Sequence, residues 1–112
     1  MHRQFEGWTP ALRERVALQV QVIRHWSVIE GDYTDAPDIE ATWFIDPPYQ
    51  GAGKHYVHGD SKINYEALGR WCQERRGQPI VCEQEGATWL PFRSLGSFKA
   101  ANGRTTAEAV WP

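Results

Sequence analysis

The sequence predicts an α/β fold, because short apolar runs typical of strands alternate with segments that have helical spacing. Two such runs, 41–45 and 79–82, flank a helical segment, and the chain ends in a pattern typical of a β-hairpin. The chain has 112 residues, enough for one compact domain and too few for two. We therefore predict a single domain over residues 1–112, with central parallel strands, flanking helices and an antiparallel hairpin at the carboxyl end.

The first predicted helix runs from Pro10 to about His25. Thr9 supplies a hydroxyl cap, and the proline that follows suits the first helical position. Apolar residues then recur at spacings of four, four and three, which forms one apolar stripe. The stripe consists of Leu12, Val16, Val20 and Ile23. Alternation over 19–22 leaves a short strand there as an alternative.

Three strands are predicted before the tail, at 26–30, 41–45 and 79–82, each a short run of apolar or β-branched residues. An acidic loop with a proline, 34–40, separates the first two. The tail is predicted to form a hairpin with arms near 97–99 and 107–111 and Asn102-Gly103 at its turn.

A second helix is predicted to start at the cap residue Asn64. Its apolar face would hold Leu68, Trp71 and Cys72, and Gly77 would end it in the left-handed conformation.

Composition limits the classes of function. The net charge is −2, whereas a stand-alone DNA-binding domain is more often basic, because phosphate contacts supply most of the affinity. No apolar run approaches the roughly 20 residues of a membrane span, and residues 1–6 lack a signal-peptide apolar segment. Cys72 and Cys82 are read as two reduced thiols. These features predict a cytoplasmic protein without a membrane partner.

The tetrapeptide Asp46-Pro47-Pro48-Tyr49 directly follows the predicted strand 41–45. Ligands of open α/β sheets bind at the carboxyl ends of strands. A carboxylate can accept one N–H of an amino group on a flat ring, and the carbonyl between two prolines can accept the other, because both prolines fix φ. An aromatic ring can then stack on the base. The pattern predicts a site for an exocyclic amine.

Residues 43–49 resemble the catalytic motif of the amino-methylating DNA methyltransferases, which act on adenine N6 or cytosine N4. The resemblance implies a Rossmann-like sheet, S-adenosylmethionine as methyl donor and DNA as partner, with Asp46, Pro47, Pro48 and Tyr49 as catalytic residues. Gly31-Asp32-Tyr33 resembles the segment that contacts the cofactor, so Asp32 and Tyr33 are expected to bind it. The tail resembles the antiparallel hairpin that closes the family's sheet.

The glycine-rich cofactor loop of that family does not precede the motif here. Gly51-Ala52-Gly53-Lys54 is glycine-rich but follows the motif, so we interpret it as a flexible loop. The chain therefore resembles the carboxyl-terminal part of a methyltransferase, a truncated form of its sheet.

The loop after the motif carries a local basic patch. Lys54, His55, His58 and Lys62 are candidates for contacting nucleic acid, and a solvated loop is the alternative. His55 and His58 are too few ligands for zinc, so no metal site is predicted. Glu83 and Glu85, after the third strand, are expected in a solvated acidic turn beside Asp46.

We therefore expect a DNA methyltransferase-like protein that is incomplete and needs a partner chain or missing segment for the donor site. The alternative is a catalytically inactive, prophage-type remnant, or a binding or assembly module with the same fold. Methylation of a protein amide is a weaker alternative, since that motif carries Asn where Asp46 stands. In the family's sheet, two further strands lie between the strands that correspond to 26–30 and 41–45, and without them an open edge is left. Either 26–30 pairs directly with 43–45, or the open edge pairs with a second copy or a partner chain. Of these, we expect a homodimer.

Overall fold

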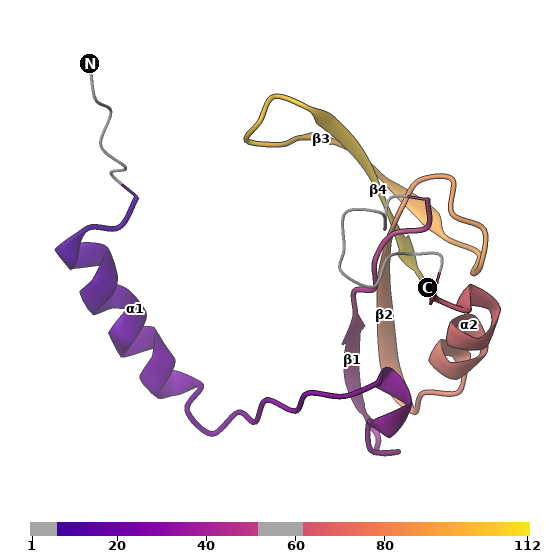
Figure 1. Cartoon of the computed structure of the whole chain (residues 1–112), viewed down its shortest axis with the longest axis horizontal. Coiled ribbons are helices and arrows are strands. Elements are labelled where there is room, and N and C mark those ends of the chain that lie inside the picture. The colour runs from indigo at the N-terminus through magenta and orange to yellow at the C-terminus, as the bar shows by residue number, and fades with distance from the viewer. Residues whose placement is uncertain (1–6, 52–61) are drawn as a thin grey trace. The chain divides into compact units, whose positions relative to one another are not determined.

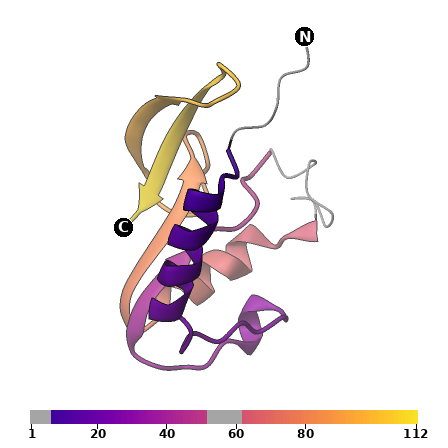
Figure 2. The same ribbon diagram turned by 90° about the vertical axis from the view of Figure 1, so that its left-hand side faces the viewer.

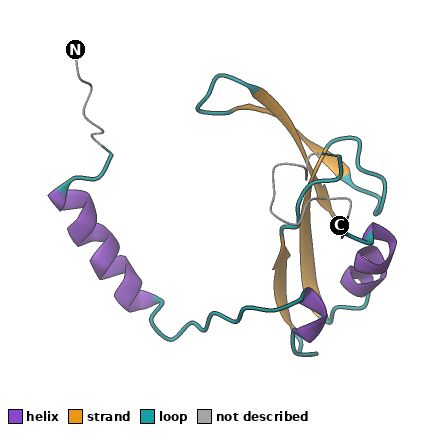
Figure 3. Ribbon diagram, in the orientation of Figure 1, coloured by secondary structure: helices purple, strands orange, loops and turns teal. Residues whose placement is uncertain are grey.

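The computed structural model describes residues 7–51 and 62–112, which fall into two units divided after Asp32. The described chain is α/β, with two α-helices and one mixed, open four-stranded sheet (Figure 3). Neither described helix is long and apolar enough to cross a membrane. The single domain over residues 1–112 stays a prediction.

The first unit contains helix α1, Pro10–Val22. As predicted, the Thr9 hydroxyl caps it by accepting a hydrogen bond from the Leu12 backbone N–H at 3.1 Å. The helix ends three residues before the predicted His25, and no residue of α1 is buried.

The predicted strand at 26–30 is wrong, because these residues form no strand in the structure. Val28 is 98 % exposed, so its β-branched side chain has no neighbouring strand to pack against. The alternative in which this segment pairs with 43–45 is wrong as well. Among the described residues, the strand at 41–45 pairs only with the strand that begins at Gly77.

The second unit is built around the sheet, with strand order β1-β2-β4-β3 (Figure 1). Strand β1, Ala41–Ile45, has its predicted bounds and runs parallel to β2, Gly77–Gln84. Strand β4, Thr105–Trp111, is antiparallel both to β2 and to β3, Arg93–Lys99. The two tail strands, β3 and β4, thus pair with each other, and β4 also pairs with β2.

Helix α2, Tyr65–Gln73, begins as predicted, with the Asn64 side chain accepting from the Ala67 N–H at 3.0 Å. It ends before Gly77. That glycine has a positive φ of 98°, but it starts β2 instead of ending the helix. A Cβ there would lie 2.0 Å from the Ala41 carbonyl oxygen, so the glycine permits close approach of β1 and β2.

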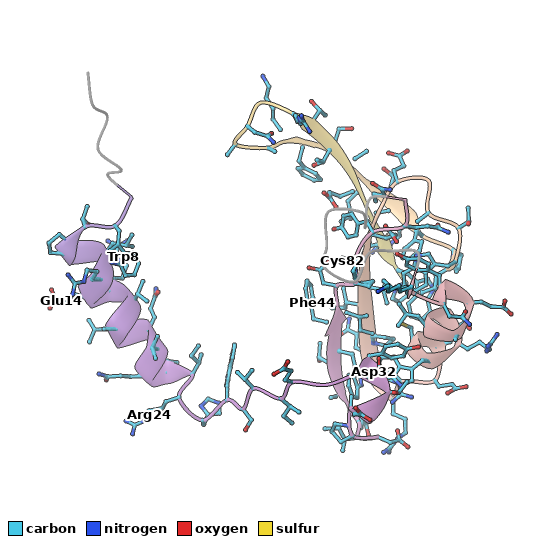
Figure 4. All side chains as sticks on the ribbon, viewed as in Figure 1. Trp8, Glu14, Arg24, Asp32, Phe44 and Cys82 are labelled. Atoms are coloured by element: carbon cyan, nitrogen blue, oxygen red, sulfur yellow. The ribbon has the colours of Figure 1, made fainter. Side chains whose placement is uncertain are left out.

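The core lies between α2 and one face of the sheet. Its buried members are Leu68, Cys72, Val81 and Leu90, and aromatic side chains surround them. Alternation along β1 places Phe44 on the opposite face, where it is 71 % exposed and projects away from α2 (Figure 4). Within the second unit, α2 therefore covers one face of the sheet only.

Candidate functional site

The motif starts where β1 ends, at the carboxyl edge of the parallel strand pair. Ile45 pairs with Val81, so Asp46 and Cys82 follow at the same level of the two neighbouring strands. The Asp46 side chain is exposed. Burial, together with the nearby Asp46 and Glu108 carboxylates, raises the pKa of the Cys82 thiol. Asp46 thus presents its carboxylate at the edge predicted from the sequence.

Three hydrogen bonds to different elements hold the segment after Asp46, two through its backbone and one through a side chain. The Tyr65 hydroxyl, at the start of α2, donates to the Pro48 carbonyl oxygen at 2.8 Å. The Tyr49 hydroxyl donates to Glu108 Oε2 on β4 at 3.0 Å. The Gln50 N–H donates to a carboxylate on β2, at 3.1 Å to the nearer oxygen. The turn is therefore held by α2, β4 and β2 together.

Glu83 supplies that carboxylate and is fully buried, at 0 % exposure. Its Oε1 also accepts from the Gln84 N–H at 2.7 Å, and its Oε2 accepts from the Trp89 indole N–H at 2.8 Å. A buried carboxylate is costly unless its oxygens are hydrogen-bonded. Three N–H donors meet that need, and one of them belongs to the motif loop.

Tyr49 is constrained by its electrostatic surroundings. Burial raises the pKa of its hydroxyl, and the hydrogen bond to Glu108 and the charges of Glu108 and Asp46 raise it further. At neutral pH the hydroxyl therefore keeps its proton, which is the proton it donates to Glu108. The ring is consequently tethered at its hydroxyl end to β4.

A pocket of about 240 Å³ lies next to this tether. Its lining includes Tyr49, Gln84, Glu85, Thr105, Thr106 and Glu108. Carboxylate, amide and hydroxyl oxygens make the lining rich in hydrogen-bond acceptors. A ligand with N–H donors, such as an amino group on a ring, matches that chemistry.

The sequence-predicted site residues lie in different places. Asp46, Pro47, Pro48 and Tyr49 directly follow β1 at the carboxyl end of the parallel strands. Glu83 and Glu85 were both expected after the third strand, but Glu83 lies within β2 and only Glu85 follows it. The expectation of a solvated acidic turn is wrong for Glu83, because its side chain points to the core face of β2. Lys54, His55 and His58 lie outside the described residues.

The predicted cofactor residues Asp32 and Tyr33 do not follow a strand. Tyr33 begins a 3₁₀ turn, Tyr33–Asp35, and its ring packs edge-on against Trp71 with centroids 5.1 Å apart. Asp32 is exposed at the end of the first unit. Lys62 is also exposed, shortly before α2.

Sequence reasoning missed Tyr65 and Glu108 and misjudged Glu83. The alternation along β2 offered one signal, because Glu83 shares a face of the strand with the apolar residue Val81. No pattern along the chain pointed from Glu108 to Tyr49, which lie 59 positions apart.

Within 7–51 and 62–112, no group of three or more His, Cys, Asp or Glu side chains is placed to hold a metal ion. Comparison of the chain with protein-family models, with curated proteins and with solved structures finds no match.

Proposed function

We propose that the chain is a DNA amino-methyltransferase-like protein that acts on adenine N6 or cytosine N4. The observation that carries the proposal is the position of Asp46-Pro47-Pro48-Tyr49, at the carboxyl end of a parallel strand and held from three elements. Such rigidity favours catalysis, because groups aimed in advance need not reorganise during the reaction.

The roles follow from the chemistry of the groups. The exposed Asp46 carboxylate accepts one N–H of the target amine, and the Pro47 carbonyl accepts the other. Tyr65 occupies the Pro48 carbonyl, the next one along the chain. The ring of Tyr49 stacks on a base that has left the duplex. S-adenosylmethionine would supply the methyl group.

The sheet supports the same proposal. The resemblance implies a parallel strand, a helix, a second parallel strand and a closing antiparallel hairpin, in a Rossmann-like arrangement. Strand β1, helix α2 and strand β2 follow in that order, and the antiparallel strands β3 and β4 come after them.

The donor site is the incomplete part of this proposal. We propose that a partner chain or a further segment supplies it, and that a second copy or that partner covers the open edge of β1. Backbone N–H and C=O groups along a free edge are a template for pairing with another strand.

A second candidate is a catalytically inactive binding or assembly module, as in a prophage-type remnant. The packing of Tyr33 against Trp71 favours it, because this places a predicted cofactor residue in a core cluster. The absence of a strand at 26–30 also favours this candidate, because Asp32 then does not follow a strand.

The first test asks whether the donor site of the isolated chain is incomplete, which both candidates imply. We expect the isolated chain to bind S-adenosylmethionine weakly or not at all, so low micromolar donor leaves its melting temperature unchanged. A ligand at 100 times its Kd would add about 2.7 kcal/mol to the free energy of unfolding. A clear rise in melting temperature at low micromolar S-adenosylmethionine would contradict the view that the donor site is incomplete.

Catalysis is tested in a complex of the chain with its partner, by transfer of labelled methyl groups to DNA. Asp46→Ala is expected to abolish transfer while the melting temperature holds, because the side chain is exposed. Tyr49→Phe keeps the stacking ring and should lose less activity than Tyr49→Ala. Unchanged transfer in Asp46→Ala would remove the motif from the mechanism. A complex that never methylates DNA would favour the inactive module.

A further inference from the structure

One segment of the second unit is cationic although the chain as a whole is not. Residues 93–107, which form β3, the connection and the start of β4, contain three cations and no Asp or Glu, in a chain of net charge −2. Arg93 donates to the Pro112 carbonyl. The other two, Lys99 and Arg104, lie at the exposed end of the strand pair. We call residues 98–106 the ribbon tip.

The register places the ribbon tip at the motif's end of the sheet. Gln84, the last residue of β2, pairs with Glu108, so residues 105–107 extend past the carboxyl end of β2. Asp46 stands at the same end of the neighbouring strand. Figures 1 and 2 show the tip projecting beyond this edge in both views.

The ribbon tip also shares a face with the motif's anchor. Phe98 pairs with Thr106, which lies two residues from Glu108, so all three side chains share a face of the sheet. Two residues of strand span roughly 7 Å. Thr106 and Tyr49 both line the 240 Å³ pocket, and Phe98 is 52 % exposed beyond it. The surface therefore continues from Tyr49, through the pocket, to an exposed aromatic ring.

The tip cations are free to meet an external anion. In the ranges 7–51 and 62–112, the arginines that form ion pairs with acidic side chains are Arg70, Arg75 and Arg76. Lys99 and Arg104 are both exposed and form no ion pair within those ranges.

We propose that the ribbon tip is a DNA-binding arm, in which Lys99 and Arg104 contact phosphates and Phe98 contacts a base near the target. The choice of DNA rests on the proposed function. Two cations near an exposed aromatic ring suit a nucleic-acid strand, because cations bind the phosphates of its backbone and the ring stacks on its bases. A two-stranded ribbon fits the major groove of B-form DNA, whereas that of an RNA duplex is too narrow.

The test measures DNA binding by the whole chain, using fluorescence anisotropy with a short DNA duplex that contains one mismatched adenine. Affinity is measured over a series of salt concentrations starting at low ionic strength. Lys99→Gln combined with Arg104→Gln should lower the slope of log K against log salt by about 1.8, because each phosphate contact contributes about 0.9. Phe98→Ala should weaken binding at least about fivefold with an unchanged slope, and Phe98→Tyr should restore it.

Matched controls separate the arm from general charge and hydrophobicity. Arg13→Gln with Arg15→Gln removes the same charge from α1, and Leu95→Ala removes a side chain that is as exposed as Phe98, at 52 %. Both should leave the affinity and the slope as they are. Circular dichroism confirms that each variant folds.

Several results would overturn the proposal: equal losses in the control variants, no salt-sensitive binding to the duplex, or equally tight binding to an RNA duplex. The proposed function is judged separately, by methyl transfer in the complex. If the complex methylates DNA while the tip variants bind like wild type, only the arm is wrong. If the tip variants weaken binding but no methylation occurs, the arm stands and the proposed function fails.

Discussion

At the scale of single residues, Glu83 links the core to the motif. Glu83 is an acidic residue whose side chain lies on the core face of β2. Its carboxylate accepts hydrogen bonds from the Gln50 backbone N–H and from the Trp89 indole N–H. A sequence pattern shows its position on the strand but not all of its donors, because two of the three lie 33 residues before it and six residues after it. For the same reason, the sequence predicts that Asp46 directly follows β1 but does not predict the hydrogen bonds that hold residues 48–50.

Replacing Glu83 by Gln should destabilise the protein by about 1.5–3 kcal/mol, because an amide nitrogen takes the place of one acceptor oxygen among three N–H donors. The free energy of unfolding in urea, followed by tryptophan fluorescence, measures this. Glu85→Gln is the matched control, since Glu85 is exposed and should change stability by less than about 0.5 kcal/mol. Equal effects of the two substitutions would show that the buried hydrogen bonds of Glu83 are unimportant.

At the scale of elements, local patterns predicted those parts that have a strong chemical signal. Strand β1 has the predicted bounds, and Thr9 and Asn64 cap the two helices as expected. Residues 26–30 are also a short run with apolar and β-branched side chains, yet they form no strand. Strand formation depends on a partner and on burial, neither of which a short segment encodes alone.

Gly77 shows how a correct conformational signal can be assigned to the wrong element. Gly77→Ala should cost at least about 3 kcal/mol of stability, because a Cβ at that position would lie 2.0 Å from the Ala41 carbonyl oxygen. Gly86→Ala is a close control: its φ of 97° matches the 98° of Gly77, but nothing lies within 4 Å. Gly86→Ala should lower the free energy of unfolding by only about 1 kcal/mol, the cost of holding a residue with a Cβ in the left-handed conformation. Thermal unfolding of both variants checks the difference, and similar losses would mean that no close approach of β1 and β2 exists.

At the scale of the whole molecule, the second unit has surfaces that none of its own elements covers. β1 is an edge strand, and Phe44 on its outer face is 71 % exposed. The parallel neighbours β1 and β2 could be predicted from two apolar runs around a helix, because parallel strands need such a crossover. Whatever pairs with the open edge of β1 comes from another chain or from a distant segment. Such contacts are not encoded in a local sequence pattern.

We expect the chain to form a homodimer through the β1 edge, so light scattering at high micromolar concentration should give twice the mass of one chain. Phe44→Lys should yield monomers, because a charge on an edge strand opposes pairing with another strand. Leu18→Lys is the control, since Leu18 is a similarly exposed apolar residue on α1. If Leu18→Lys dissociates the dimer and Phe44→Lys does not, helix α1 forms the interface instead. A monomeric wild type with a cooperative melt would show that the open edge of β1 is stable alone, and a covering partner would then have to be a different chain.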